Sequence, residues 1–185
     1  MKFIDLESER LIYRKFKKED LPIYLDMCGS IDNNKFKQGE PSSEADISEW
    51  FNKTISKLED DEYTSFHYAV CIKSENRLIG EVFLFGLPDE PEVGWDVHSD
   101  YWNQGYGTEM GKTILRFGFD ILNLRRIISG CNAYNTGSYR IMEKIGMRRE
   151  AHFIKAKKGN SALNYEWCDW FQYAILQEEW KAVNI

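Results

Sequence analysis

The sequence contains no long apolar run and no cysteine pattern, and these absences exclude several classes of protein. No stretch approaches the roughly 18 apolar residues that a membrane-spanning helix needs. The segment from Met1 to Arg10 is charged and has no apolar signal-peptide core. No Cys-x-x-Cys pair or Cys/His cluster is present, which argues against zinc and against a disulfide framework. We therefore expect a reduced, cytoplasmic protein with no membrane partner and no metal. The cysteines are widely separated, at Cys28, Cys71, Cys131 and Cys168.

The sequence also has no excess of positive charge. Lysine and arginine total 24 against 30 aspartate and glutamate residues, so the formal net charge is −6 at pH 7. This balance argues against a nucleic-acid surface and is compatible with the attraction of a cationic acceptor. The length of 185 residues, with 43% hydrophobic and 29% charged residues, predicts one soluble domain over residues 1–185.

What the sequence does contain is a strand that leads through glycines into a helix. Glu92–Val97 combines β-branched and aromatic residues and predicts a strand. Gln104–Gly107 then forms a glycine turn. A helix is expected to follow as far as about Leu122, since apolar residues recur on one face. They have spacings of four, three and four, at Met110, Ile114, Phe117 and Ile121.

The start of this helix is a candidate anion site. The first N–H groups of a helix have no partner within it, and the helix dipole places partial positive charge there. Glycines let the backbone approach an anion closely. We therefore predict that Gly105–Thr108 hold a phosphate through backbone groups. The alternative is a tight turn in which Gly107 only begins the helix.

The remaining segments predict an α+β fold. The order of strands and helices favours a mixed, mostly antiparallel sheet of about seven strands with helices on both faces. Further helices are expected at Lys18–Met27, from Ser42 or Ser43 to Leu58, and at Asn135–Lys144, where Asn135 is the expected N-cap. The expected strands are Arg10–Phe16, Thr64–Lys73, Arg77–Phe85, Glu92–Val97, Arg125–Asn132, Met147–Lys155 and Leu163–Leu176.

Other segments are expected to be irregular. Cys28–Gly39 is polar and predicts a loop, Lys157–Asn160 predicts a hairpin turn, and Gln177–Ile185 predicts a tail. The acidic run Glu59–Glu62 is interpreted as the solvated end of the second helix, because acidic side chains oppose the dipole at a helix C-terminus. The alternative is a rim that attracts cations.

The glycine turn resembles the cofactor motif of the GNAT superfamily of N-acetyltransferases. The family pattern Arg/Gln-x-x-Gly-x-Gly/Ala aligns with Trp102–Gly107, although Trp102 replaces the usual Arg or Gln. Tyr101–Glu109 is similar to the version found in the ribosomal-protein N-terminal (alanine/serine) acetyltransferase branch. The resemblance covers nearly the whole chain and implies a single GNAT-like domain. Further matching segments are Ser8–Arg14, Asn135–Met147 and Asp169–Leu176.

The resemblance implies that the turn binds the pyrophosphate of acetyl-coenzyme A, with no metal. It also implies that a backbone N–H near Val97 stabilises the oxyanion of the reaction. Asn135 resembles a coenzyme-contacting residue of the family, and a simple N-cap is the alternative reading. The coenzyme-binding residues implied in this way are Val97, Trp102, Asn103, Gln104, Gly105, Tyr106, Gly107, Thr108 and Asn135.

In the family, the acceptor amine attacks the thioester directly and must first lose a proton. Glu92 is the candidate base, because some family members place a catalytic glutamate at the start of the central strand. A carboxylate there can act directly or through water, provided that desolvation raises its pKa. A solvated strand-end glutamate is the alternative. Asp96 lies on the same side of that strand, and Glu81 and His98 rank behind it.

A second group must stabilise the departing thiolate. The tyrosine that many family members use as the acid is replaced here by Met142, so the resemblance implies Ser138 instead. The alternative for Ser138 is a first-turn serine that bonds to the backbone.

The resemblance thus implies an acetyl-CoA-dependent N-acetyltransferase acting on a protein N-terminus or a small-molecule amine. The alternative is a coenzyme A-binding module with little or no transfer. The acceptor region is implied to be Tyr24–Leu58 and Lys155–Leu163, where no motif identifies the amine. A Rossmann domain is disfavoured, because the glycines follow a late strand. The oligomeric state, monomer or homodimer, is left open, and so is the length of the acyl chain.

Overall fold

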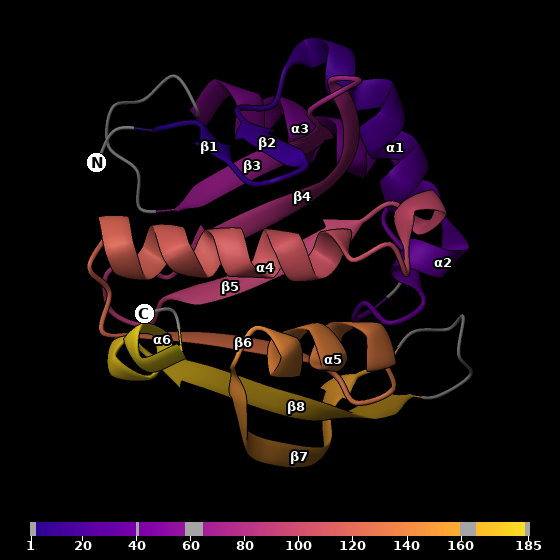
Figure 1. Ribbon diagram of the computed structural model, residues 1–185. Helices are drawn as coiled ribbons and strands as arrows, with labels where there is room; N and C mark the ends of the chain where they lie inside the picture. The colour runs from indigo at the N-terminus through magenta and orange to yellow at the C-terminus, as the bar shows by residue number, and fades with distance from the viewer. Residues whose placement is uncertain (1–2, 40, 58–64, 160–165, 184–185) are drawn as a thin grey trace.

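The computed structural model describes residues 3–39, 41–57, 65–159 and 166–183 (Figure 1). Its centre is an eight-stranded sheet in the order β1-β2-β3-β4-β5-β6-β8-β7. Neighbouring strands are antiparallel except β5 and β6, which are parallel. The strands are β1 Leu6–Glu7, β2 Leu11–Arg14, β3 Phe66–Ile72, β4 Arg77–Phe85, β5 Glu92–Val97, β6 Arg126–Asn132, β7 Arg148–Lys158 and β8 Trp167–Leu176.

This sheet confirms the predicted mixed, mostly antiparallel α+β fold. It has one strand more than expected, because the chain pairs with itself before the first predicted strand. Leu6 of β1 lies opposite Tyr13 of β2, and Leu6 is buried. The burial of Leu6 stabilises β1. The strand is too short to show a sequence period, so the sequence did not predict it.

Helices cover both faces of the sheet (Figure 1). On one face, α1 and α3 pack through a cluster that includes Tyr24, Met27, Ile47 and Phe51. On the other face, α4 and α5 pack through the larger cluster, which includes Met110. No described helix is long and apolar enough to cross a membrane. The helices are α1 Leu21–Gly29, α2 Ile31–Asn34, α3 Glu44–Lys57, α4 Tyr106–Arg116, α5 Thr136–Lys144 and α6 Gln177–Val183.

The helix after the glycine turn follows the predicted apolar pattern for most of its length. Met110, Ile114 and Phe117 are buried, as expected. Ile121 is 54% exposed, so its predicted inward position is wrong. The chain winds into a π-helical turn, η3, over Phe117–Ile121, and this wider winding rotates the residue away from the face set by 3.6 residues per turn.

Two segments predicted to be irregular are helical. The loop expected at Cys28–Gly39 contains α2, whose Asn33 is buried and bonded to the end of β5. The tail expected from Gln177 forms α6 instead. There, Trp180 is 6% exposed, packs against Phe119 and donates from Nε1 to Asp120 at 3.1 Å. Both helices depend on contacts far away in the chain, which local composition does not reveal.

The last hairpin differs from its prediction in length. β7 continues to Lys158, which lies opposite Trp167 of β8, so the turn expected at Lys157 begins later. Asn160, the last residue of that turn, and the acidic run Glu59–Glu62 lie outside the described residues.

β5 and β6 separate soon after they begin. They pair at Glu92 and Ile128, whereas β5 pairs with β4 along its length, from Phe85 opposite Glu92 to Gly80 opposite Val97. The later half of β5 therefore has an edge that no described strand covers. This open edge lies beside the beginning of α4 and positions the candidate site.

Candidate active site

A cavity of about 600 Å³ lies beside the end of β5, between α2, α4 and α5. Most of the residues predicted to bind the coenzyme line it. Gln104 does not line it, because its side chain turns back and donates to the Asp100 carbonyl at 3.0 Å. The lining includes Val97, Trp102, Asn103, Gly105, Tyr106, Gly107, Thr108 and Asn135.

The two glycines of the turn have different structural tasks. Gly105 has φ 84°, a left-handed conformation that a side chain would strain, and it immediately precedes α4. Gly107 lies inside α4, where an added Cβ would come within 2.6 Å of Ile141 Cδ1 on α5. One glycine therefore shapes the turn, and the other lets α4 and α5 approach each other.

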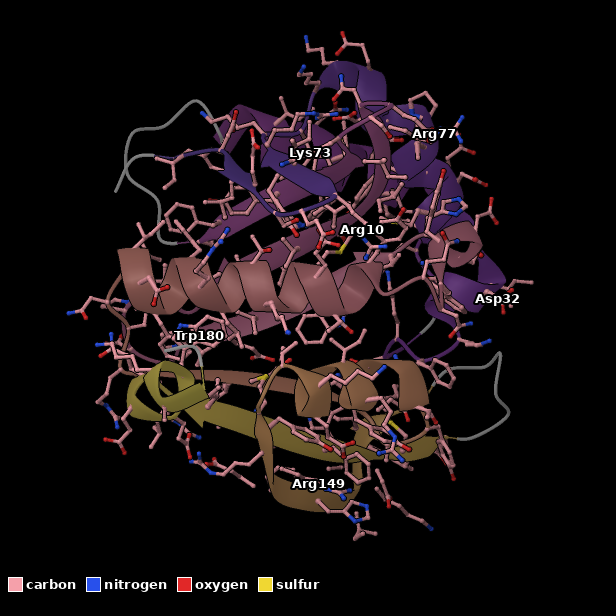
Figure 2. The ribbon with its side chains drawn as sticks, viewed as in Figure 1. Arg10, Asp32, Lys73, Arg77, Arg149 and Trp180 are labelled. Atoms are coloured by element: carbon pink, nitrogen blue, oxygen red, sulfur yellow. The ribbon has the colours of Figure 1, made fainter. Side chains whose placement is uncertain are left out.

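The first turn of α4 is anchored to the beginning of β2. Glu109 accepts from the Arg10 backbone N–H at 2.8 Å, from Arg10 Nε at 2.7 Å and from Ser8 Oγ at 2.7 Å. Arg10 also donates to the Gln104 carbonyl at 2.9 Å and lies over the Tyr106 ring. Figure 2 shows Arg10 between β2 and the part of α4 nearest to its beginning. The turn is thus held in place before any ligand arrives.

Cationic side chains line the same cavity, in a protein of net charge −6. They are Lys35, Arg140 and Lys144. Lys35 pairs with Asp32 at 2.9 Å, and Arg140 pairs with Glu143 at 2.8 Å. Together with the N-terminus of α4, these cations favour an anionic ligand.

The open edge of β5 directs backbone groups towards the cavity. The N–H of His98 donates to Ile79 of β4 at 2.8 Å. Because neighbouring residues of a strand alternate in direction, the N–H and C=O groups of Val97 point the other way. The Val97 carbonyl accepts from Asn33 Nδ2 at 2.8 Å and from Trp102 Nε1 at 2.7 Å. These bonds fix the strand end whose N–H is the predicted oxyanion donor.

The two predicted catalytic residues do not line one cavity. Ser138 lines it, near the beginning of α5, and its N–H donates to the Asn135 side chain at 3.0 Å. Asn135 is thus the N-cap, as predicted. Glu92 is half-buried where β5 and β6 begin to separate, outside the cavity lining. Burial raises the pKa of Glu92, Glu90 raises it further, and Lys157 partly offsets both effects.

The other carboxylates considered from the sequence belong to a polar cluster beneath α1. Asp96 lines the cavity and pairs with Lys37 at 3.0 Å. Glu81 is buried and lies 2.6 Å from His67 Nε2. His98 also reaches α1 but has other partners, since its Nε2 lies 3.0 Å from Asp26 and its Nδ1 accepts from the Asp100 N–H.

Sequence reasoning missed Asn33 and Lys37. Both lie in a polar stretch without periodicity, so only the fold reveals that they reach β5. Arg10 and Glu109 lie in segments that resemble the family, and this resemblance was the sequence signal that could have identified them. Their pairing required the fold, since the two residues are 99 positions apart.

A family model described as an acetyltransferase (GNAT) domain matches residues 10–148. An uncharacterised N-acetyltransferase of Bacillus subtilis, YnaD, is 35% identical over 178 residues, which cover 95% of this chain and 98% of that protein. A crystal structure of a GNAT-family acetyltransferase from Bacillus anthracis is 33% identical, with a TM-score of 0.81, and the match covers 95% of this chain and 99% of that one.

More distant solved structures share the fold. A spermidine N-acetyltransferase from Vibrio cholerae, in complex with CoA and spermine, is 20% identical with a TM-score of 0.78 over 93% of this chain and 98% of that one. A ribosomal-protein-S5-alanine acetyltransferase from Vibrio fischeri is 19% identical with a TM-score of 0.78 over 96% and 99%. The family model and the Bacillus relatives show that this chain belongs to the GNAT family of acetyltransferases.

Proposed function

We propose that this N-acetyltransferase transfers an acetyl group from acetyl-CoA to a primary amine by direct attack of the amine. The observation that carries the proposal is the continuity of one cavity. It extends from the left-handed Gly105 and the first turn of α4 to the open edge of β5 at Val97. One ligand with a phosphate group at one end and an acyl group at the other matches that arrangement.

The chain's own groups fit such a ligand. A side chain at Gly105 would strain the turn, and the first-turn N–H groups with Lys35, Arg140 and Lys144 supply positive charge for phosphates. The Val97 N–H would stabilise the oxyanion that develops on the acyl carbon. Acetyl-CoA supplies the activated thioester.

Two proton-transfer roles complete the proposal. Ser138 is the proposed donor to the departing thiolate, and its place in the cavity lining supports this role. Glu92 is the base proposed from the family resemblance. Its half-burial and raised pKa support the role, and its position outside the lining requires a water molecule between it and the amine.

The acceptor is proposed to be a primary amine, either a protein N-terminus or a small molecule. The distant relatives named above suggest a panel that contains spermidine, spermine and a peptide with an N-terminal alanine. Because their identity to this chain is low, these proteins show a shared fold and not a shared substrate. The panel should therefore also include simple alkylamines.

Turnover of this panel, with acetyl-CoA binding measured by calorimetry, tests the proposed function. We expect binding and acetylation of at least one amine, and a loss of rate in Ser138→Ala without a loss of binding. Binding without acetylation of any amine would favour the alternative, a GNAT-fold module that holds coenzyme A. Absence of binding would contradict both readings.

A further inference from the structure

A buried and a half-buried acidic side chain lie side by side under α1. Glu81 of β4 and Asp96 of β5 are direct cross-strand partners, so their Cβ atoms are about 5 Å apart on one face of the sheet. That face is the one that α1 and α3 cover, since Tyr24 of α1 reaches Glu81 at 3.5 Å. Placing two carboxylates this close, one of them buried, is unfavourable unless cations or hydrogen-bond donors compensate them.

Each carboxylate has a cationic or hydrogen-bonding partner of a different kind. His67 from β3 lies 2.6 Å from Glu81. Lys37, from the segment between α2 and α3, places its ammonium 3.0 Å from Asp96. His67 belongs to the sheet and its side chain is 19% exposed, whereas Lys37 belongs to an irregular segment and its side chain is 38% exposed. The partner of Asp96 is therefore the one that a ligand can replace.

The position of Asp96 relates this cluster to the cavity. Asp96 lines the cavity and lies next to Val97, the predicted oxyanion donor. Side chains alternate along a strand, so the carboxylate of Asp96 is on the α1 face while Val97 packs towards α4. An amine that approaches from the α1 face would meet an acyl group held at the open edge of β5.

On the basis of the proposed function, we propose that Asp96 binds the ammonium of the acceptor in place of Lys37. Asp96 then receives a proton from that ammonium. Lys37 is a primary alkylammonium, so it already shows which ligand chemistry Asp96 accepts. Asp96 is therefore a better candidate for the proton acceptor than Glu92, because Glu92 lies where β5 and β6 are still paired.

The ammonium gives one proton to the Asp96 carboxylate and becomes a neutral amine. Its nitrogen forms a bond to the acyl carbon and the carbon–sulfur bond breaks. Ser138 gives its hydroxyl proton to the departing thiolate, and the second proton of the nitrogen replaces it. The products are an amide, a thiol and one proton, which Asp96 releases to solvent.

The groups around Asp96 determine how its charge responds to pH. Burial raises the pKa of Asp96, Lys37 lowers it, and Glu81 raises it. His67 faces the pair from β3, and Tyr24 and Cys28 face it from α1. Burial raises the pKa of the Cys28 thiol to about 11 and holds that of Tyr24 high, so both remain neutral near pH 7. Lys37 is thus the cation whose removal would most directly raise the pKa of Asp96.

The test compares variants of the full protein with the panel amine that turns over fastest. We expect Asp96→Asn to lower kcat on the order of 100-fold or more, with acetyl-CoA affinity unchanged by calorimetry. Asp89→Asn, an exposed carboxylate before β5, is the matched control and should retain wild-type kcat. Glu92→Gln should cost less than Asp96→Asn.

The pH dependence of Lys37→Met tests whether Lys37 occupies the ammonium site at Asp96. Loss of its positive charge should move the acidic limb of the kcat/KM profile to higher pH and lower the KM for the amine. Wild-type kcat in Asp96→Asn, or an unmoved limb in Lys37→Met, would overturn the proposal while leaving the acetyltransferase function intact.

A binding measurement decides the case in which no panel amine turns over. Each amine is titrated into wild type and Asp96→Asn in the presence of coenzyme A. Amine binding that Asp96→Asn abolishes supports the site. Absence of amine binding to wild type overturns it, and failure of coenzyme A to bind identifies failure of the proposed function instead.

Discussion

Arg10 and Glu109 are 99 residues apart and join the beginning of β2 to the first turn of α4 through two hydrogen bonds, at 2.8 and 2.7 Å. Arg10 also holds the Gln104 carbonyl, immediately before the turn. The conformation of the predicted anion site therefore depends on a side chain that is far away in the sequence.

Loss of the Glu109 charge should destabilise the protein in a pH-dependent way. Burial raises the pKa of Glu109, but bonds from Arg10 and Ser8 outweigh it and hold the folded-state pKa below its ordinary value of 4.5. A depressed folded pKa contributes stability above the unfolded value and loses it as the pH falls through the folded value. We expect Glu109→Gln to cost about 1–3 kcal/mol at pH 7.

Urea denaturation between pH 3 and 7 measures this difference. The advantage of the wild type over Glu109→Gln should shrink as the pH falls below 4.5. Glu75→Gln, in an exposed pair with Arg77, is the control and should change stability by less than about 0.5 kcal/mol. A pH-independent difference for Glu109→Gln would show that its charge is not the cause.

The left-handed conformation of Gly105 predicts a specific loss on substitution. Gly105→Ala should cost about 1–2 kcal/mol of folding free energy, because φ is 84° while the added Cβ would meet only Arg10 Nη2 at 3.4 Å. The same change should weaken acetyl-CoA binding, since the turn would relax away from its present shape. Gly29→Ala, with open space around it, is the control. Equal stability and affinity in both variants would contradict the role of the turn.

The C-terminal helix should contribute to stability. Trp180→Ala removes a buried side chain that packs on Phe119 and donates to Asp120, so we expect a loss of about 3–5 kcal/mol. Thermal or urea unfolding measures it. Trp167→Ala is the control, because that side chain is exposed and should cost less than about 1 kcal/mol. Similar losses in the two variants would mean that α6 does not pack as described.

The hydrogen bonds of Asn33 indicate that α2 stabilises the end of β5 beside the cavity. Asn33→Ala removes the donor to the Val97 carbonyl and the acceptor for the Ser99 N–H, so we expect a loss of about 1–3 kcal/mol and a higher KM for acetyl-CoA. Ile31→Ala, an exposed position of the same helix, should change neither. An unchanged KM in Asn33→Ala would show that the bond to β5 is dispensable.

The sequence predicted the elements whose signals are local. Glycine spacing and one apolar face located α4, and the β-branched segments located β3, β4, β5 and β6. The helices that were not predicted, α2 and α6, are short and depend on contacts such as Asn33 with Val97 and Trp180 with Phe119. Their sequences are too short for a helical period to be distinguished from chance.

The residues of the candidate site also divide into those with a local sequence signal and those without one. The turn residues Gly105–Thr108 were predicted because phosphate binding by backbone leaves a glycine pattern. Glu81 and Asp96 were each considered as a base from the sequence, but no sequence pattern indicates that the two carboxylates form a pair. This pairing follows from the register of β4 and β5, which a sequence pattern does not specify.

Calorimetric titration of acetyl-CoA into wild type and Thr108→Trp most directly tests the central claim, that the first turn of α4 holds the phosphates. Thr108 lines the cavity, whereas Lys112 on the same helix is exposed and outside the lining, so Lys112→Trp is the control. We predict binding in wild type and Lys112→Trp and its loss in Thr108→Trp, with all three proteins folded. Unchanged binding in Thr108→Trp, or none in wild type, would contradict the claim.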